Sequence, residues 1–302
     1  MEEILITEKS RDYELLDSGD GQKLERYGSV VLSRLDPQVL WPKTLGEEQW
    51  QRADAIFTRT AVSGKWSIKD KMSKTLFDIK GWQVTLEGIT FGLKLLPSKH
   101  VGVFPEQSAH WKWLTRIIQM RSNDTNEKIK VLNLFGYTGG ATLACAKAGA
   151  SVVHVDSSEW AVNTAKENAK LSGLSDKPIR FIADDVRKFV EREVKRGSKY
   201  DVIILDPPVY GKGENKQKRK QIWKIEENLM PLLSRLKNII SSNPLAIILN
   251  GYSSGYSHIT YAQMLSSVAS DLAGKISSGQ LAVKESASGK LLPSGIFAHW
   301  EK

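Results

Sequence analysis

Short apolar runs alternate with helical segments from Lys130 to the end of the chain, and this alternation limits the folds that the chain can adopt. Five of the runs are each followed by a segment long enough for a helix. They are VLNLF (131–135), SVVHVD (151–156), IRFIADD (179–185), YDVIILD (200–206) and PLAIILN (244–250). Strands that alternate with helices at this spacing are typical of a doubly wound, mostly parallel sheet.

The last two apolar runs differ from the others in their spacing. LAVKES (281–286) and IFAHW (296–300) lie too close together for a crossover helix, so we expect a hairpin around Pro293-Ser294-Gly295. The last strand should then be antiparallel to the rest of the sheet. The pattern as a whole predicts an α/β fold with a seven-stranded, mostly parallel sheet.

The first part of the chain has a different pattern, with short β-like runs separated by turns that contain glycine. YELL (13–16) and the run at 27–35 form one possible pair, and Trp82 to Leu86 forms a clearer hairpin with Ile89 to Leu96 through Glu87-Gly88. A helix should follow from Gln107 to Met120. The polar segment RSNDTNEK (121–128) is then the expected linker. We therefore predict a smaller β-rich N-terminal domain at residues 1–120 and a second domain at residues 121–302.

Composition and charge narrow the class of protein. No apolar run is long enough for a membrane span, and the acidic start MEEILITEKS is unlike a signal peptide. The single cysteine, Cys145, excludes thiolate metal clusters, and the five histidines show no ligand spacing, so we expect a cytoplasmic protein without a metal. A net charge of +9 favours a polyanionic partner, of which nucleic acid is the commonest.

A glycine-containing loop follows the first strand of the second domain. The segment NLFGYTGG (133–140) lies where the strand ends and a helix begins, so backbone amides at the helix start can bind a negative group. Asp156 ends the next strand, where a carboxylate can bind both hydroxyls of a ribose. Loop and acid together indicate a nucleoside cofactor. The alternative is a tight strand–helix turn with Asp156 capping the next helix.

Two further features indicate which nucleoside is bound. The spacing of Gly136 and Gly139-Gly140 does not fit the G-x-G-x-x-G fingerprint of dinucleotide-binding proteins, which argues against a nicotinamide-dependent oxidoreductase. Asp184-Asp185 can accept a hydrogen bond from an adenine amino group, with Val186 against the ring. The segment DPPVY (206–210) follows the fourth strand, and its two prolines stiffen the loop that carries Asp206. These features favour S-adenosylmethionine.

The segment from Lys130 to Lys302 resembles a class I S-adenosylmethionine-dependent methyltransferase domain, which has a Rossmann-like fold. It is most similar to the group that contains the large-subunit rRNA methyltransferases I and K/L. The resemblance rests on the loop 133–140, Val155-Asp156, ADDV (183–186) and DPPVYG (206–211). The segment HVGVFPEQ (100–107) resembles a run in that group which folds over the cofactor, although Val101 replaces the usual Thr. Residues 1–80 do not resemble the group's usual RNA-binding (PUA) domain.

The resemblance implies S-adenosyl-L-methionine as the cofactor and a set of residues that bind it. They are Phe104, Gln107, Phe135, Gly136, Tyr137, Thr138, Gly139, Asp156, Ser157, Asp184, Asp185, Val186 and Asp206.

Catalysis should depend on the stiff loop after the fourth strand. Asp206 and the carbonyl groups of Pro207 and Pro208 can accept hydrogen bonds from an amine, and Tyr210 can stack on a base. Methylation of a pyrimidine at carbon 5 usually needs a cysteine nucleophile. Cys145 lies among Ala and Leu in the helix after the glycine loop, which is typical of a buried thiol. The expected product is therefore methylated on nitrogen.

A basic segment follows the stiff loop directly. We expect its cations, Lys212, Lys216, Lys218, Arg219 and Lys220, to contact phosphates, the alternative being a solvated loop. The predicted function is S-adenosylmethionine-dependent methylation of a base nitrogen in RNA, with rRNA as the expected partner. The alternative is a methyltransferase that acts on a protein side chain or a small molecule.

Overall fold

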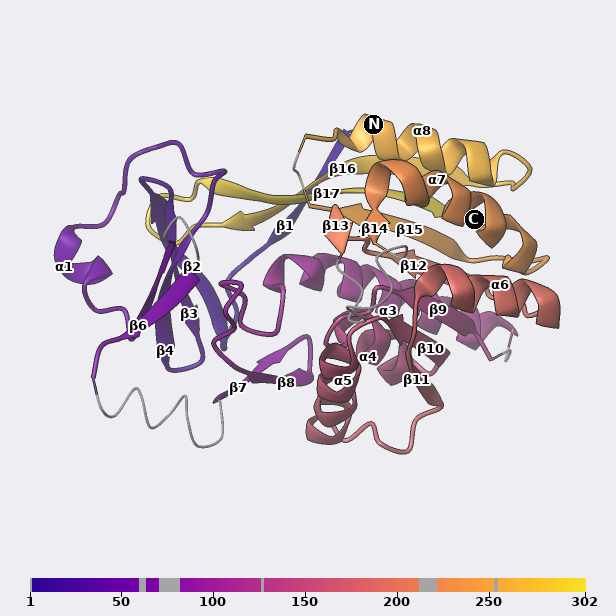
Figure 1. The fold of residues 1–302 in the computed structure, drawn as a ribbon, viewed down its shortest axis with the longest axis horizontal. Coiled ribbons are helices and arrows are strands. Elements are labelled where there is room, and N and C mark those ends of the chain that lie inside the picture. The colour runs from indigo at the N-terminus through magenta and orange to yellow at the C-terminus, as the bar shows by residue number, and fades with distance from the viewer. Residues whose placement is uncertain (1, 60–63, 71–81, 126–127, 212–221, 253–254) are drawn as a thin grey trace. The chain divides into compact units, whose positions relative to one another are not determined.

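The computed structural model describes residues 2–59, 64–70, 82–125, 128–211, 222–252 and 255–302 (Figure 1). The chain divides into two compact units. The larger unit comprises Met1–Leu5, Ala109–Leu281 and Ser294–Lys302, and the smaller comprises Ile6–Ser108 and Ala282–Pro293. The expected division at residue 120 differs from this one in three segments. Residues 1–5 and 109–120 belong to the larger unit, and residues 282–293 belong to the smaller unit.

An eight-stranded sheet forms the centre of the larger unit, in the order β1-β16-β17-β15-β12-β9-β10-β11. Its strands are β1 (Glu2–Thr7), β9 (Lys130–Leu134), β10 (Ser151–Asp156), β11 (Ile179–Ala183), β12 (Val202–Leu205), β15 (Ala246–Gly251), β16 (Lys275–Lys284) and β17 (Leu291–Glu301). The strands from β15 to β11 pair in parallel, and β17 pairs antiparallel with β15. The predicted α/β, Rossmann-like fold and its antiparallel last strand are confirmed. The sheet has one strand more than the expected seven, because β1 from the other end of the chain pairs beside β16.

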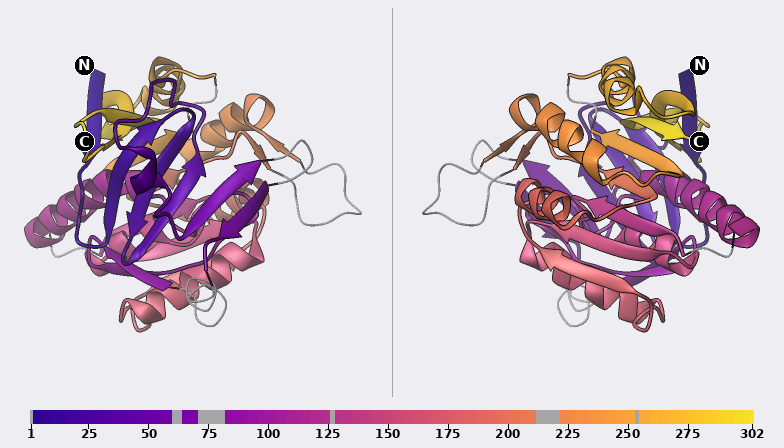
Figure 2. Two further views of the ribbon diagram at one scale, coloured as in Figure 1. Left: turned by 90° about the vertical axis from the view of Figure 1, so that its left-hand side faces the viewer. Right: turned by 90° about the vertical axis from the view of Figure 1, so that its right-hand side faces the viewer.

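Helices cover both faces of this sheet, as expected for a doubly wound fold (Figures 1 and 2). One face carries α3 (Ser108–Thr125), α4 (Gly140–Lys147) and α5 (Glu159–Leu171). The other face carries α6 (Val186–Arg196), α7 (Ile225–Leu236) and α8 (His258–Ala269). Because the central strands are buried on both faces, their sequences are continuous apolar runs.

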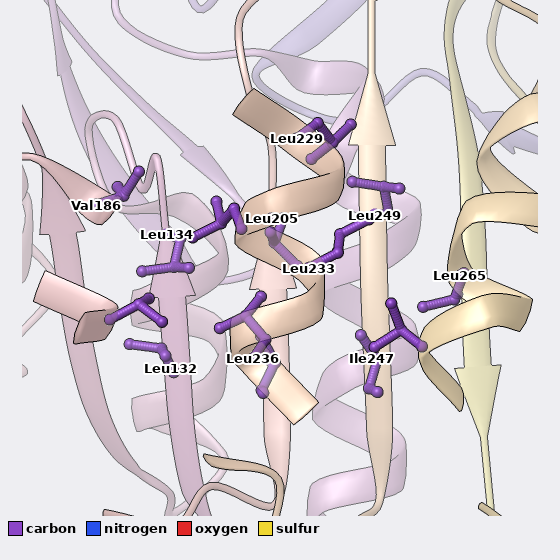
Figure 3. Close-up of a cluster of buried hydrophobic side chains, with 14 of the residues drawn as sticks. Leu132, Leu134, Val186, Leu205, Leu229, Leu233, Leu236, Ile247, Leu249 and Leu265 are labelled. Atoms are coloured by element: carbon purple, nitrogen blue, oxygen red, sulfur yellow. The ribbon is translucent and has the colours of Figure 1, made fainter. Parts of the chain in front are cut away.

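Two apolar cores hold the helices on the sheet. In Figure 3, Leu229, Leu233 and Leu236 of α7 lie against the strand residues Leu205 and Leu249. On the opposite face, side chains of α3 and α4 pack on alternate residues of the same strands. Each fully buried leucine contributes about 1.5–3 kcal/mol. The two cores thus enclose the paired strands β9 and β12 from both faces of the sheet.

Several expected element boundaries are wrong. The helix expected from Gln107 to Met120 extends to Thr125, so much of the expected linker 121–128 is helical. The hairpin expected around Pro293-Ser294-Gly295 turns earlier, because Glu285 N–H donates to the carbonyl of Lys290 at 2.8 Å and Gly289 adopts a φ of 76° there. Those three residues lie within β17 instead.

The smaller unit is rich in β-structure, as predicted. Its sheet has the order β2-β3-β4-β5-β6. Its elements are β2 (Tyr13–Gly19), β3 (Gln22–Tyr27), β4 (Val30–Leu35), α1 (Glu47–Trp50), β5 (Ala55–Arg59), β6 (Gly64–Ile68), the hairpin β7 (Trp82–Leu86) and β8 (Ile89–Leu93), and the short helix η1 (Pro105–Gln107). The turn predicted at Glu87-Gly88 is confirmed, with φ values of 52° and 69°.

A buried ion pair lies within the sheet of the smaller unit. Arg34 Nη2 lies 2.5 Å from Glu25 Oε2, and the hydroxyls of Tyr13 and Tyr27 donate to Glu25 Oε1 at 3.0 and 3.1 Å. Burial alone would raise the pKa of Glu25, but Arg34 and Lys23 outweigh it and hold that pKa below its usual value. The carboxylate is therefore charged and fully hydrogen-bonded, which is the condition under which a buried charge is tolerated.

Among the described residues, no helix has both the length and the apolar character needed to cross a membrane. The same part of the chain holds no cluster of three or more His, Cys, Asp or Glu residues suited to a metal ion.

Candidate functional site

The loops that carry the predicted site residues follow neighbouring strands of the larger unit. From β9 the chain continues to β10 on one side of the sheet, and β12 lies on the other side of β9. The strand order therefore reverses between β9 and β12, and ligands of open α/β sheets bind outside the carboxyl ends of the strands at such a point. The loops 135–139, 156–158, 184–185 and 206–209 all begin at this edge.

The glycine loop has an unusual backbone. Phe135 and Tyr137 adopt left-handed φ values of 59° and 49°, and Gly139 has a φ of 96°. Gly136 N–H donates to the carbonyl of Val155 at 3.1 Å, which ties the loop to β10. Gly139 is the N-cap of α4 and supplies no side-chain cap, so the first amides of this helix have no acceptor from a capping side chain. Amides in that position favour a negative group.

Asp156 holds this loop through one carboxylate oxygen and the start of α5 through the other. Oδ2 accepts the Tyr137 N–H at 2.9 Å, and Oδ1 accepts the Ser158 N–H at 2.9 Å. Ser158 is the N-cap of α5, so the alternative in which Asp156 caps that helix is not what the structure shows. A carboxylate oxygen has more than one acceptor position, so Asp156 can bind hydroxyl groups while it holds the loop.

Asp184 and Asp185 both have partners within the protein. Asp185 is the N-cap of α6, where it accepts from Arg187 N–H at 2.9 Å and forms an ion pair with the Arg187 guanidinium at 2.5 Å. Burial alone would raise the pKa of Asp185, but Arg187 outweighs it and lowers that pKa. Asp184 accepts from Asp185 N–H at 2.8 Å and pairs with Arg192. Val186 is buried at the start of α6. Their contact with adenine stays a prediction.

Trp223 connects the two loops on either side of the reversal point. Its indole N–H donates to the carbonyl of Pro208 at 2.6 Å, and its ring packs on Phe135 with 4.8 Å between centroids. Trp223 belongs to β14 (Trp223–Lys224), which pairs with β13 (Tyr210–Gly211). Helix α7 begins directly after this pairing, at Ile225. No local pattern in the sequence indicates this role.

Asp206 lies at the carboxyl end of β12, beside the start of the glycine loop. Its N–H donates to the carbonyl of Leu134 at 3.4 Å. Tyr261 of α8 is buried nearby, and burial together with the negative charge of Asp206 raises the pKa of this tyrosine. The Tyr261 hydroxyl therefore stays protonated. No motif in the sequence indicates a role for Tyr261, whose apolar surroundings are typical of a core residue.

Two tyrosines are exposed at the ends of neighbouring strands. Tyr210 follows β12 and is 52% exposed, and Tyr252 follows β15 and is 39% exposed. Large aromatic rings with this exposure are available to a flat partner such as a base. Tyr210 was predicted from the sequence and Tyr252 was not.

The other predicted site residues have different positions. Ser157 is exposed between Asp156 and Ser158, and Thr138 is buried with its carbonyl accepting from Asn168 Nδ2 at 2.9 Å. Phe104 and Gln107 belong to the smaller unit, so their role with the cofactor stays a prediction. The cations Lys212, Lys216, Lys218, Arg219 and Lys220 lie outside the described residues.

The protein-family model described as "S-adenosylmethionine-dependent methyltransferase" matches residues 69–246, more than half of the chain. The chain belongs to this family. The predicted class of enzyme and its cofactor, S-adenosylmethionine, are thereby confirmed at the level of the family.

Solved structures agree with this assignment. This methyltransferase is 37% identical to the S-adenosylmethionine-dependent methyltransferase from Agrobacterium tumefaciens, with a TM-score of 0.90 over 99% of this chain and 93% of that chain. The crystal structure of SMU.776 in complex with S-adenosylhomocysteine has a TM-score of 0.70 at 16% identity, over 96% of this chain and 76% of that chain. At that identity the similarity shows the fold alone.

Curated relatives align with this methyltransferase over part of their own length. The ribosomal RNA large subunit methyltransferase I of Escherichia coli (strain K12) is 30% identical over 203 residues, which are 64% of this chain and 49% of the relative. The chain thus spans about half the length of the curated relatives that it matches.

Proposed function

We propose that this methyltransferase transfers a methyl group to a base nitrogen in RNA, and that the RNA is ribosomal. The observation that carries the proposal is the stiff loop of Asp206, Pro207 and Pro208 beside the glycine loop, at the reversal point of the sheet. The names of the curated relatives and the net charge of +9 support an RNA substrate.

The residues at this edge of the sheet fit the chemical groups of S-adenosylmethionine. Asp156 offers carboxylate oxygens to ribose hydroxyls, and the amides at the start of α4 suit the carboxylate of the methionine part. S-adenosylmethionine supplies a methyl group on a sulfonium, ready for displacement by a nucleophile. The protein's task is to align that nucleophile and to exclude water.

Asp206 and the proline carbonyls are the proposed acceptors for the amine of the base. The carbonyl of Pro208 already accepts from Trp223, so we assign the main contacts to Asp206 and the carbonyl of Pro207. Hydrogen bonds to the amine hydrogens orient the nitrogen lone pair, and the Asp206 carboxylate can take the proton that the amine releases. The exposed ring of Tyr210 is the proposed stacking surface for the base.

Nitrogen is the proposed target because of the position of the single cysteine. Cys145 is buried in α4, and burial raises the pKa of its thiol well above the usual value. A thiol in that environment is not a nucleophile. Attack on carbon 6 of a pyrimidine, which carbon-5 methylation requires, therefore has no cysteine to perform it.

The basic segment that begins at Lys212 is proposed to contact phosphates. Replacing Lys216, Lys218, Arg219 and Lys220 with Gln should weaken RNA binding and flatten its dependence on salt, because each lost contact with single-stranded RNA lowers the slope of log affinity against log salt by about 0.7. Binding titrations at several salt concentrations measure both quantities. An unchanged slope would show that this segment does not contact the RNA.

Labelled methyl transfer to undermodified acceptors tests the proposed function. Total RNA and protein extract from a strain lacking this gene are offered separately, with Asp206→Asn as the inactive control. We expect label that RNase removes, together with an N-methylated nucleoside in mass spectrometry of the digested RNA. A carbon-methylated nucleoside would overturn the assignment to nitrogen. Label that only protease removes, or label in neither fraction, would overturn RNA as the substrate.

A further inference from the structure

A group of three polar side chains is buried directly beneath the glycine loop. Asn133 of β9 and His154 of β10 are paired in the sheet, and Thr142 of α4 lies above them. Asn133 Nδ2 donates to Thr142 Oγ1 at 2.9 Å, and Thr142 Oγ1 is 2.8 Å from His154 Nδ1. All three side chains are buried.

This cluster lies in surroundings that favour apolar residues. The neighbours of Asn133 and His154 on the same sheet face include Val131 and Val152, both part of the apolar core. His154 Nε2 is buried without a hydrogen-bond partner among the described residues. Burial lowers the pKa of His154 to about 4, so the ring is neutral at neutral pH. A buried polar atom without a partner is costly, although the ring also contacts Thr142 and the backbone of Tyr137. The histidine therefore calls for another explanation.

The position of Gly136 explains why a histidine lies here, because the His154 ring packs directly against the Gly136 backbone. A Cβ atom at this position would lie 2.5 Å from His154 Nδ1 and Cε1, much closer than side-chain atoms approach one another. The φ of Gly136 is outside the left-handed region, so its backbone conformation does not itself require glycine. Gly136 is needed because the loop rests on the imidazole ring.

We infer that His154 is a positioning residue for the cofactor loop, held in place by Thr142 and Asn133. Three consecutive residues of β10 then fix the loop. The ring of His154 supports it from below, the Val155 carbonyl accepts the Gly136 N–H, and the Asp156 carboxylate accepts the Tyr137 N–H. This inference rests on the proposed assignment of the loop to S-adenosylmethionine.

A double-mutant cycle between Gly136 and His154 tests the inference. Isothermal titration of the full chain with S-adenosylhomocysteine gives the affinity of each variant. We expect Gly136→Ala to weaken binding at least tenfold and His154→Ala to weaken it severalfold. Because His154→Ala removes the ring that the new methyl group meets, the double variant should bind about as well as His154→Ala alone. Independent effects that multiply in the double variant would overturn the inference.

Gly140 provides a matched control for this cycle. A Cβ atom at Gly140 would lie 2.2 Å from the ring of Trp111 and is not directed at His154. His154→Ala should therefore not restore binding to Gly140→Ala. Rescue of both glycine variants would show that His154→Ala merely loosens the fold, and would overturn the specific contact.

Kinetics and folding separate positioning from general stability. We expect His154→Ala to raise KM for S-adenosylmethionine severalfold while kcat at saturation changes less than twofold. A loss confined to kcat would contradict a positioning role. If Gly136→Ala yields no folded protein, recovery of a folded, binding double variant supports the same contact, and a double variant that also fails to fold overturns it.

Asp156→Ala distinguishes failure of this inference from failure of the proposed site. If Asp156→Ala weakens S-adenosylhomocysteine binding and Gly136→Ala does not, only the role of His154 is wrong. If neither variant weakens binding, the assignment of the loop to the cofactor is wrong as well.

Discussion

The Asp156 carboxylate holds the backbone on both sides of it, and we propose that it also binds the ribose of the cofactor. Its two oxygens accept the N–H groups of Tyr137 and Ser158. Its position is therefore set before any ligand binds, so little conformational entropy is lost on binding.

Replacing Asp156 with Ala should weaken cofactor binding much more than it destabilises the fold. Two hydrogen bonds are lost, each worth about 0.5–1.5 kcal/mol of stability, whereas S-adenosylhomocysteine affinity should fall at least tenfold. Asp201→Ala is a matched control, because Asp201 Oδ2 accepts the Lys130 N–H at 2.8 Å at the opposite end of the sheet. Thermal unfolding and calorimetric titration give both quantities. Equal affinity in the two variants would contradict the ribose assignment.

Trp223 should affect catalysis through its N–H and cofactor binding through its ring. Trp223→Phe keeps a ring against Phe135 but removes the donor to Pro208, so we expect kcat to fall about twofold to tenfold, the equivalent of one hydrogen bond. Trp223→Leu removes both contacts and should also raise KM for the cofactor. Steady-state kinetics with each variant measures these effects. A Trp223→Phe enzyme with the native kcat would show that the loop is rigid without this bond.

At the scale of single residues, the sequence predicts only those whose proposed roles depend on motifs that are local in sequence. The loop around Gly136 and the carboxylate of Asp156 follow from strand ends and glycines that are close in sequence. Trp223 and His154 act through partners that the fold brings together, such as Phe135 for Trp223. Contacts of that kind leave no periodic or spacing signal.

Asp185, a predicted adenine-binding residue, also has a structural role at the start of helix α6. Asp185 caps its first turn and is paired with Arg187. A carboxylate used in this way stabilises the helix whether or not it also binds adenine.

Substitution of Asp185 separates the two roles. Asp185→Ala removes the cap and should lower the free energy of unfolding by about 1 kcal/mol, whereas Asp185→Ser keeps a capping hydroxyl and should lose less. If Asp185 binds adenine, both variants should weaken S-adenosylhomocysteine binding to a similar extent. Denaturant unfolding and calorimetry give the two values. Full binding by Asp185→Ser would leave the residue with the capping role alone.

The strands that could be predicted are those buried on both faces. VLNLF (131–135) and the other central runs are apolar along their whole length, because helices cover both sides of the sheet. β1 was missed because its partner β16 is more than two hundred residues away. β14 was missed because two residues are too few for a pattern.

Acid should destabilise the larger unit, and with it the native molecule, through the buried histidines His110 and His154. Burial lowers the pKa of His110 to about 3 and that of His154 to about 4, below the ordinary value of 6.5. The unfolded chain therefore binds protons that the folded chain does not, and stability falls as the pH drops below about 6.5. A shift of this size in His154 corresponds to about 3 kcal/mol at most.

The measurement is the unfolding free energy between pH 7 and pH 5. The charge of Glu25, whose pKa is lowered, changes only below this window. His110→Leu should show a shallower loss than the native protein, because one buried histidine no longer titrates. An identical slope in the two proteins would show that His110 is solvated in the folded state.

The strands β16 and β17 also determine when the chain can fold during its synthesis. Residues 275–281 extend the sheet of the larger unit, while Ser286 and Ala287 donate backbone hydrogen bonds to Leu15 and Leu16 in the smaller unit. Both units therefore stay incomplete until residues 275–301 have been translated. At about 5–20 residues per second, β1 waits roughly 15 to 50 s for its partner strand. During that interval the exposed isoleucines of β1 and its unpaired edge are open to chaperones.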